Sequence, residues 1–182
     1  MLIFFWIKLG WKVFAELIHP GKKMGHVMPP KDNFMILFVT IILKDVFDLG
    51  RNFDWPRPEK CPRCEYHKVW GHGFVSALFD EFDVPLLLKR YRCPDCGCVI
   101  TLRPDSHFSR FQASIKTIRS SISRKINIKR WLPDVSTSRQ RYWFNNLKKR
   151  VAAYLTGDWD KGLIAAFDHL SEINLMPVSS II

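Results

Sequence analysis

The chain has 182 residues and a mass of 21.4 kDa, which is enough for one modest domain or two small ones. Its hydrophobic content of 47% is ordinary for a globular protein, whereas an aromatic content of 14%, with seven tryptophans, is high. The net charge is +11 and the pI is near 9.6.

The basic surplus is confined to one segment. Between Arg103 and Arg150 there are 13 Lys and Arg residues against two acids, Asp105 and Asp134, whereas the rest of the chain has 15 basic and 15 acidic residues. A localised basic segment indicates a polyanionic partner more strongly than a diffuse charge does.

The first 31 residues begin with an amphipathic helical pattern. Apolar residues recur every three or four positions, at Ile3, Ile7, Trp11, Phe14 and Ile18. No convincing secretory signal is present, because a charged start, a clean apolar core and a small-residue cleavage site are not found together. Three interpretations stay open: a helix packed on the rest of the protein, a membrane-surface helix, and translation that starts at Met24, Met28 or Met35.

The stretch from Phe34 to Leu43 is a ten-residue apolar run. It is half as long as a membrane-spanning helix, so we expect a buried helix or strand, with membrane contact as a minor alternative. A connector punctuated by prolines, residues 50–58, follows and indicates a domain boundary.

Two C-x-x-C hooks come next, Cys61 to Cys64 and Cys93 to Cys96, with 28 residues between them. Each hook places two thiolates on a tight turn, and four sulfurs close a tetrahedral shell around one zinc ion. A closed shell indicates a structural metal rather than a catalytic one. A disulfide framework is not expected, since four of the five cysteines fall in the hooks and no signal peptide precedes them.

The fifth thiol and two nearby histidines are alternative ligands. Cys98 is an alternative to Cys96, but its ordinary interpretation is a small apolar residue at the start of a strand. His67 and His72 are expected to be exposed or hydrogen-bonded, because four cysteines already fill the shell.

The residues around the hooks predict a zinc ribbon, a small antiparallel sheet with the metal at one end. Two short strands, His67–Trp70 and Phe74–Val75, are expected around a Gly-His-Gly turn. An acidic loop, Phe79–Asp83, precedes a strand over Val84–Arg92, and Val99–Leu102 leaves the second hook. Such a unit has little core, so the zinc supplies much of its folding free energy.

Beyond Pro104 the pattern becomes helical. Apolar residues recur at three- and four-residue spacings, at Phe108, Phe111, Ile115, Ile118, Ile122 and Ile126. A short second helix over Ile128–Leu132 and a turn with N-cap residues precede a helix over about Ser138–Leu155. The inward residues of that helix are Trp143, Leu147, Val151 and either Tyr154 or Leu155, with Gly157 as its stop. A last helix, Asp158–Leu170, is expected to cap the bundle.

This order of elements, a helix, a short helix, a polar turn and a basic helix, is the layout of a helix-turn-helix unit. In such a unit the first turns of the last helix contact the major groove of DNA. Arg pairs with guanine, and Gln or Asn with adenine, while lysines meet phosphates. The candidate nucleic-acid-binding residues are Arg119, Arg124, Lys125, Arg130, Arg139, Gln140, Arg141, Asn145, Lys148 and Lys149. A solvated basic helix without base contacts is the plainer alternative.

The sequence therefore predicts an α+β protein with three parts: an apolar N-terminal segment of uncertain status (1–54), a zinc ribbon (55–104) and a basic helix-turn-helix-like domain (105–182).

The runs WPRPEKCPRC, WGHG and RYRCPDCGCVITLRP resemble the zinc ribbons at the N-termini of bacterial insertion-sequence transposases. The closest likeness is to a transposon-associated group that has the ribbon and helix-turn-helix without the nuclease. The resemblance covers residues 55–104 and, more loosely, 105–157, where RQRYWFNNLKKR is similar to the last helix of that group. It implies recognition of transposon-end DNA, with Cys61, Cys64, Cys93 and Cys96 as metal ligands.

The chain departs from a complete transposase, which carries three carboxylates and two metal ions on a further domain. About 25 residues follow the last basic helix, too few for that domain. The carboxylates there are expected to be solvated: Asp158, Asp160, Asp168 and Glu172. We therefore expect no catalytic residues and no small-molecule substrate.

The prediction is a cytoplasmic, non-catalytic, zinc-dependent DNA-binding protein of mobile-element origin, which binds duplex DNA and pairs with itself or with a separately encoded transposase. Two alternatives remain: an RNA-binding zinc ribbon, and an interaction module that uses its apolar N-terminus for a protein or membrane partner.

Overall fold

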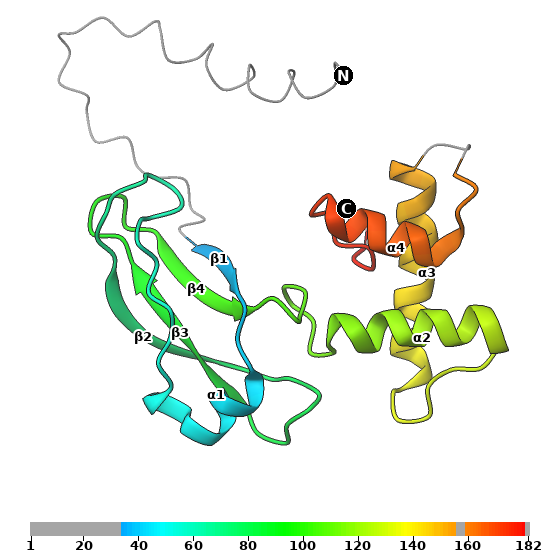
Figure 1. The fold of residues 1–182 in the computed structure, drawn as a ribbon, viewed down its shortest axis with the longest axis horizontal. Helices are drawn as coiled ribbons and strands as arrows, with labels where there is room; N and C mark the ends of the chain where they lie inside the picture. The colour runs from blue at the N-terminus through cyan, green and yellow to red at the C-terminus, as the bar shows by residue number, and fades with distance from the viewer. Residues whose placement is uncertain (1–33, 156–158, 181–182) are drawn as a thin grey trace, which may run out of the picture. The chain divides into compact units, whose positions relative to one another are not determined.

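The computed structural model describes residues 34–155 and 159–180 (Figure 1). The chain separates after Asp32 into two units, and all elements described below belong to the second, Asn33–Ile182. The predictions for the first 31 residues, for Gly157 and for Asp158 lie outside the described residues.

The described residues form an α+β fold with one four-stranded sheet and four α-helices, which confirms the predicted class. In chain order the elements are β1 (Phe34–Val39), α1 (Leu43–Leu49), a 3₁₀ turn (Gly50–Asn52), β2 (Trp70–Ala77), β3 (Leu86–Arg92), β4 (Val99–Pro104), α2 (Ile115–Ile128), α3 (Thr137–Tyr154) and α4 (Gly162–Glu172).

The sheet is mixed rather than purely antiparallel, with the strand order β1-β4-β3-β2. The pairs β2/β3 and β3/β4 are antiparallel, as predicted for the ribbon. β1 is added at the β4 edge in parallel, from the pair Phe34 and Val99 to the pair Val39 and Pro104. The sheet thus includes a strand from the segment before residue 54, which was predicted to lie outside the ribbon.

β1 is half buried, because its side chains alternate between the two faces of the sheet. Met35, Leu37 and Val39 pack on the ribbon core. Phe34 and Phe38, in contrast, are 69% and 46% exposed. The apolar run therefore forms a strand that ends before α1 rather than one fully buried element. Among the described residues, no helix has both the length and the apolar character needed to cross a membrane.

The two short strands predicted around the Gly-His-Gly turn are wrong: the residues from Trp70 to Ala77, the glycines included, form one continuous strand, β2, and His67–Val69 precede it. The pairing with β3 shifts between Gly71 and Phe74, so the glycines form an irregularity within the strand instead of a turn. Gly73 has a φ of +76°, a conformation that glycine adopts without a side-chain clash.

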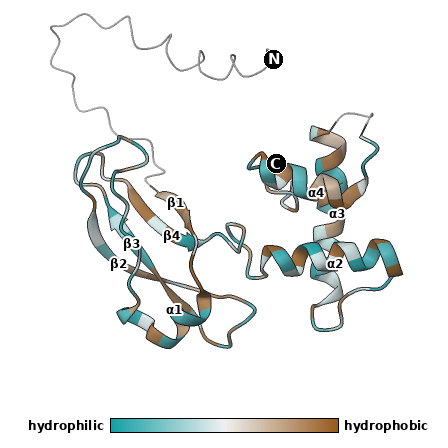
Figure 2. Cartoon of the chain, viewed as in Figure 1, coloured by the Kyte–Doolittle hydropathy of each residue, from teal (hydrophilic) through white to brown (hydrophobic). Residues whose placement is uncertain are grey.

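The helices α2, α3 and α4 pack on one another, and α2 and α3 cross steeply in Figure 1. Hydrophilic and hydrophobic residues alternate along α2 (Figure 2), and Ile118 and Ile122 on its apolar face are fully buried. They meet Trp143 and Leu147 of α3, as the predicted stripes require, and Phe167 of α4.

Two predicted helical stretches are not helical. α2 begins at Ile115, after the N-cap Ser114, so Phe108 and Phe111 precede the helix. The Arg103 guanidinium donates to the carbonyl oxygens of these two phenylalanines and holds them in turns. Both rings still pack on the helical core.

The short helix predicted over Ile128–Leu132 is also absent. α2 ends at Ile128, where Lys129 takes a left-handed conformation with φ of 57°. The ammonium groups of Lys125 and Lys129 donate to the carbonyl oxygens of Lys129 and Ile126, which satisfies this end of the helix. The residues from 129 to 136 connect α2 to α3 without regular structure.

Candidate metal centre and nucleic-acid interface

The first hook is a tight turn closed by backbone hydrogen bonds. The Cys61 N–H donates to the Tyr66 carbonyl at 2.8 Å, and the Glu65 N–H donates back to the Cys61 carbonyl at 2.9 Å. Glu65 has a φ of 60°, which lets the chain reverse after Cys64.

The second hook repeats the first at the backbone level. The Cys93 N–H donates to the Cys98 carbonyl at 2.9 Å, and the Gly97 N–H donates to the Cys93 carbonyl at 3.1 Å. Gly97, four residues after the first cysteine as Glu65 is in the other hook, has a φ of 71°. Both pairs of thiols therefore sit on the same turn geometry.

The four hook cysteines meet at one point. All their Sγ atoms lie within 4.8 Å of one another. The Cys61–Cys96 and Cys64–Cys93 Sγ separations are 3.7 and 3.5 Å. A disulfide would need about 2 Å, whereas tetrahedral zinc with bonds of about 2.3 Å places its sulfurs roughly 3.8 Å apart. The four cysteines are therefore positioned to hold one metal ion.

Backbone N–H donors favour ionisation of the Cys61 thiol. Burial opposes the thiolate of Cys61, but the N–H groups of Cys64 and Arg63, together with neighbouring thiols, outweigh it and lower the Cys61 pKa to about 7. The partners shift the other way: the Tyr66 N–H lowers the pKa of Cys64, but burial and the three neighbouring thiols outweigh it and raise that pKa, and burial raises the pKa of Cys96. Because a metal binds thiolates rather than thiols, binding at this cluster must release protons.

The alternative ligands lie outside the cluster. Cys98 is fully buried beside it, and burial raises the pKa of this thiol. His67 and His72 are exposed. Within residues 34–155 and 159–180, the four cysteines form the group of metal-binding side chains that the geometry brings together.

Some of the predicted nucleic-acid residues are held in ion pairs. The Arg119 guanidinium donates to both Asp168 carboxylate oxygens at 2.7 Å. Arg139 lies 2.9 Å from the Asp80 carboxylate and 5.4 Å from the centre of the Trp143 ring. Both arginines are still partly exposed, so they add charge to the surface but are not free to reach far.

Gln140 was predicted to contact a base, and the structure contradicts this. Its side chain is fully buried. The amide oxygen accepts from the Ser121 hydroxyl at 2.6 Å and the Leu132 N–H at 2.9 Å. The amide nitrogen donates to the carbonyl oxygens of Leu132 and Val135. Gln140 therefore fixes the loop between α2 and α3 to both helices.

Trp131 of the same loop and Phe144 of α3 form an aromatic cluster that is bordered by lysines. The Trp131 and Phe144 rings meet edge to face, with centroids 5.9 Å apart. The Lys125 ammonium lies 4.8 Å from the Trp131 ring centre, and that of Lys148 lies 5.3 Å from the Phe144 ring centre. Arg124 donates to the Trp131 carbonyl oxygen at 3.2 Å. Two predicted cations thus lie over the two rings and a third binds the Trp131 backbone, although neither ring was predicted to take part.

The remaining predicted residues are exposed: Arg130, Arg141, Asn145, Lys148 and Lys149. On α3, Arg141, Asn145 and Lys148 share one helix face with Phe144, because side chains three, four and seven positions apart are neighbours. Trp131 could have been found from the sequence as the one aromatic residue in the basic run from Arg124 to Trp131.

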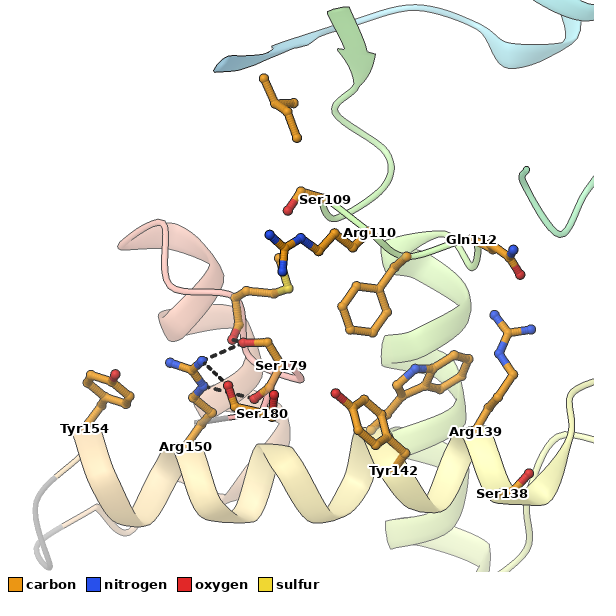
Figure 3. A pocket seen from close by; sticks show the side chains of 14 residues that line it. Ser109, Arg110, Gln112, Ser138, Arg139, Tyr142, Arg150, Tyr154, Ser179 and Ser180 are labelled. Carbon is orange, nitrogen blue, oxygen red and sulfur yellow. Dashed lines mark hydrogen bonds between the residues drawn. The ribbon is translucent and has the colours of Figure 1, made fainter. Parts of the chain in front are cut away.

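Another side of α3 lines an open groove of about 980 Å³ (Figure 3). Arg139, Tyr142, Arg150 and Tyr154 project into it from the helix. The Arg150 guanidinium donates to Ser179 and Ser180 and covers the Tyr154 ring at 5.2 Å. Arg139 and Arg150 are therefore engaged within the protein, and Arg110 is the third arginine that lines this groove.

Comparison with known proteins gives no family: no family model, no curated protein and no solved structure matches the chain. Among the described residues, the carboxylates weighed for catalysis are not part of any group placed to hold a metal ion. Asp168 is engaged by Arg119, and Asp160 and Glu172 are exposed.

Proposed function

We propose that the protein is a zinc-ribbon, DNA-binding protein without catalytic activity. The observation that carries this proposal is that the metal-binding cysteines and the basic residues lie in different parts of the chain. Four cysteines converge on one point of the ribbon, and 13 basic residues against two acids fall in the segment that ends in α3.

Zinc is the metal that suits the cysteine cluster. Four thiolates form a soft, tetrahedral donor set, and zinc is the common ion that takes such a set without redox chemistry. Cys61, Cys64, Cys93 and Cys96 would occupy all four positions, so the ion would join two hooks and leave no site for a substrate. Its role is structural.

The basic surface of α2 and α3 is the proposed contact with DNA. Arg141, Asn145 and Lys148 share a face of α3, and Arg124 and Lys125 border it from α2 through Trp131. Lys and Arg neutralise phosphates and release counterions. With Gln140 buried, Arg141 and Asn145 remain as exposed candidates for base contacts, since Arg suits guanine and Asn suits adenine.

The origin in a mobile element is also a proposal. It rests on the resemblance of residues 55–104 to transposase zinc ribbons and on the cationic helices that follow. The helix-turn-helix assignment is supported by the steep crossing of α2 and α3, with residues 129–136 in place of the short helix.

The test is DNA binding measured by fluorescence anisotropy at low ionic strength. A variant with Arg141→Gln and Lys148→Gln should bind DNA at least tenfold more weakly than the wild type. The matched control is Lys44→Gln with Lys60→Gln, which removes the same charge from two exposed ion pairs in the ribbon half of the chain. Equal losses in both variants, or tighter binding of a structured RNA competitor, would contradict the proposal.

A further inference from the structure

The aromatic cluster formed by Trp131 and Phe144 is more than a solvated end of the helical core. Trp131 lies in the loop after α2, and Phe144 lies in the middle of α3, so two separate segments bring the rings together. Both rings are half buried, which leaves part of each aromatic surface in contact with solvent.

The loop that carries Trp131 is fixed rather than adaptable. Leu132, its neighbour, exchanges two hydrogen bonds with the buried Gln140 amide. The Trp131 carbonyl oxygen itself accepts from Arg124. A side chain held on such a frame loses little conformational entropy when a ligand stacks on it.

Three cations contact the two aromatic residues, and the acid of the same loop is Asp134. Lys125 and Lys148 stand over the two ring faces, and Arg124 is bonded beside them. Neither the run from Arg124 to Trp131 nor that from Arg141 to Arg150 contains an acid. Rings next to ammonium groups offer a nucleobase a stacking surface and its phosphate a cation in the same place.

We infer that this cluster binds unpaired nucleobases, so that the protein prefers DNA with a single-stranded segment to fully paired duplex. The inference rests on the proposed DNA-binding function and names the form of DNA. Bases inside a duplex are stacked on one another and cannot lie on a protein ring, whereas unpaired bases can. The cations of α2 and α3 hold the adjoining phosphates in either case.

The first test uses the unaltered protein. Its affinity is measured for a single-stranded oligonucleotide, for the blunt duplex of the same sequence, and for that duplex with a single-stranded extension. The expected order is tighter binding of both DNAs that carry unpaired bases. Equal or tighter binding of the blunt duplex overturns the inference but leaves the proposed function intact, whereas no binding of any of the three at low ionic strength overturns both.

The second test compares variants of one ring. Trp131→Leu should weaken single-strand binding by about tenfold, as expected for the loss of one stacked base, with less than a twofold change for blunt duplex. Trp131→Phe should restore most of the affinity, because it keeps an aromatic face. Trp159→Leu is the matched control, since Trp159 also lies under a lysine, Lys161 at 5.8 Å, but next to α4. Equal losses for single strand and duplex in Trp131→Leu would overturn the inference.

Discussion

Gln140 uses all of its hydrogen-bonding capacity inside the protein. Its amide joins Ser121 of α2, the loop residues Leu132 and Val135, and α3 itself. A buried amide satisfied on every side fixes geometry rather than reading a base. From the sequence, its position in the first turn of a basic helix predicted a base contact, because nothing in the pattern shows which polar residue turns inward.

Replacing Gln140 with Ala should therefore affect folding first. The change leaves the buried Ser121 hydroxyl and the partly buried Leu132 N–H without this partner, so the free energy of unfolding should fall by about 2–4 kcal/mol. Urea denaturation measures this. Asn145→Ala, one turn further along and exposed, is the control and should stay within about 0.5 kcal/mol of wild type.

His107 gives the folded chain a dependence on pH. Its ring is almost fully buried, and it faces Glu81, Asp80 and Arg103 and packs edge to face on Phe79. Burial is the largest influence and lowers the His107 pKa below its ordinary value of 6.5, although Glu81 opposes this.

The sign of the effect follows from the lowered pKa. Below pH 6.5 the unfolded chain takes up a proton that the folded chain resists, so stability is lost as the pH falls through the folded pKa. Urea denaturation at pH 8 and pH 5.5 should show a larger loss for wild type than for His107→Phe, which keeps the contact with Phe79. An identical loss in both proteins would show that His107 does not titrate in this range.

At the scale of elements, the two hooks and β3, the strand that leads into the second hook, could be predicted well. The spacing of Cys61, Cys64, Cys93 and Cys96 determines the cluster, because each C-x-x-C pair needs only a local turn. The parallel addition of β1 could not be predicted, since it depends on a pairing with β4 more than 60 residues away. The single β2 strand was missed because a bulge hides glycines that usually mark a turn.

The helices show the same division between local and distant causes. The apolar stripes of α2 and α3 follow from local spacing and were predicted, and so was a turn with N-cap residues before α3, where Ser136 is the cap. The start of α2 after its cap Ser114 was not predicted, because the apolar spacing already begins at Phe108. The loop after Ile128 was not, because it is set by the left-handed Lys129 and by the buried Gln140, which only the folded structure brings to it.

The metal cluster predicts different outcomes for neighbouring thiols. Cys93→Ser removes one of four ligands and should leave the protein with much less than one bound zinc per chain and a disordered ribbon sheet. Cys98→Ala, which alters a buried thiol outside the cluster, should retain one zinc. Elemental analysis and circular dichroism of the two variants measure this. Equal zinc content in both proteins would show that the cluster is not the metal site.

At the scale of the whole molecule, charge is distributed by segment. The ribbon half is close to neutral, and the surplus belongs to the segment that includes α2 and α3. The sequence predicted this distribution fully, because counting charges needs no structure. The structure adds which cations are paired, such as Arg119 with Asp168, and which border the rings, such as Lys125 and Lys148.

The salt dependence of DNA affinity tests the central claim most directly, because only phosphate neutralisation releases counterions. For wild type, the logarithm of the association constant should fall linearly with the logarithm of salt concentration. The slope should become shallower by roughly 1.4 to 1.8 when Arg141 and Lys148 are replaced with Gln, and should not change in the Lys44 and Lys60 control. A slope near zero, or no binding at the lowest ionic strength, would contradict the account.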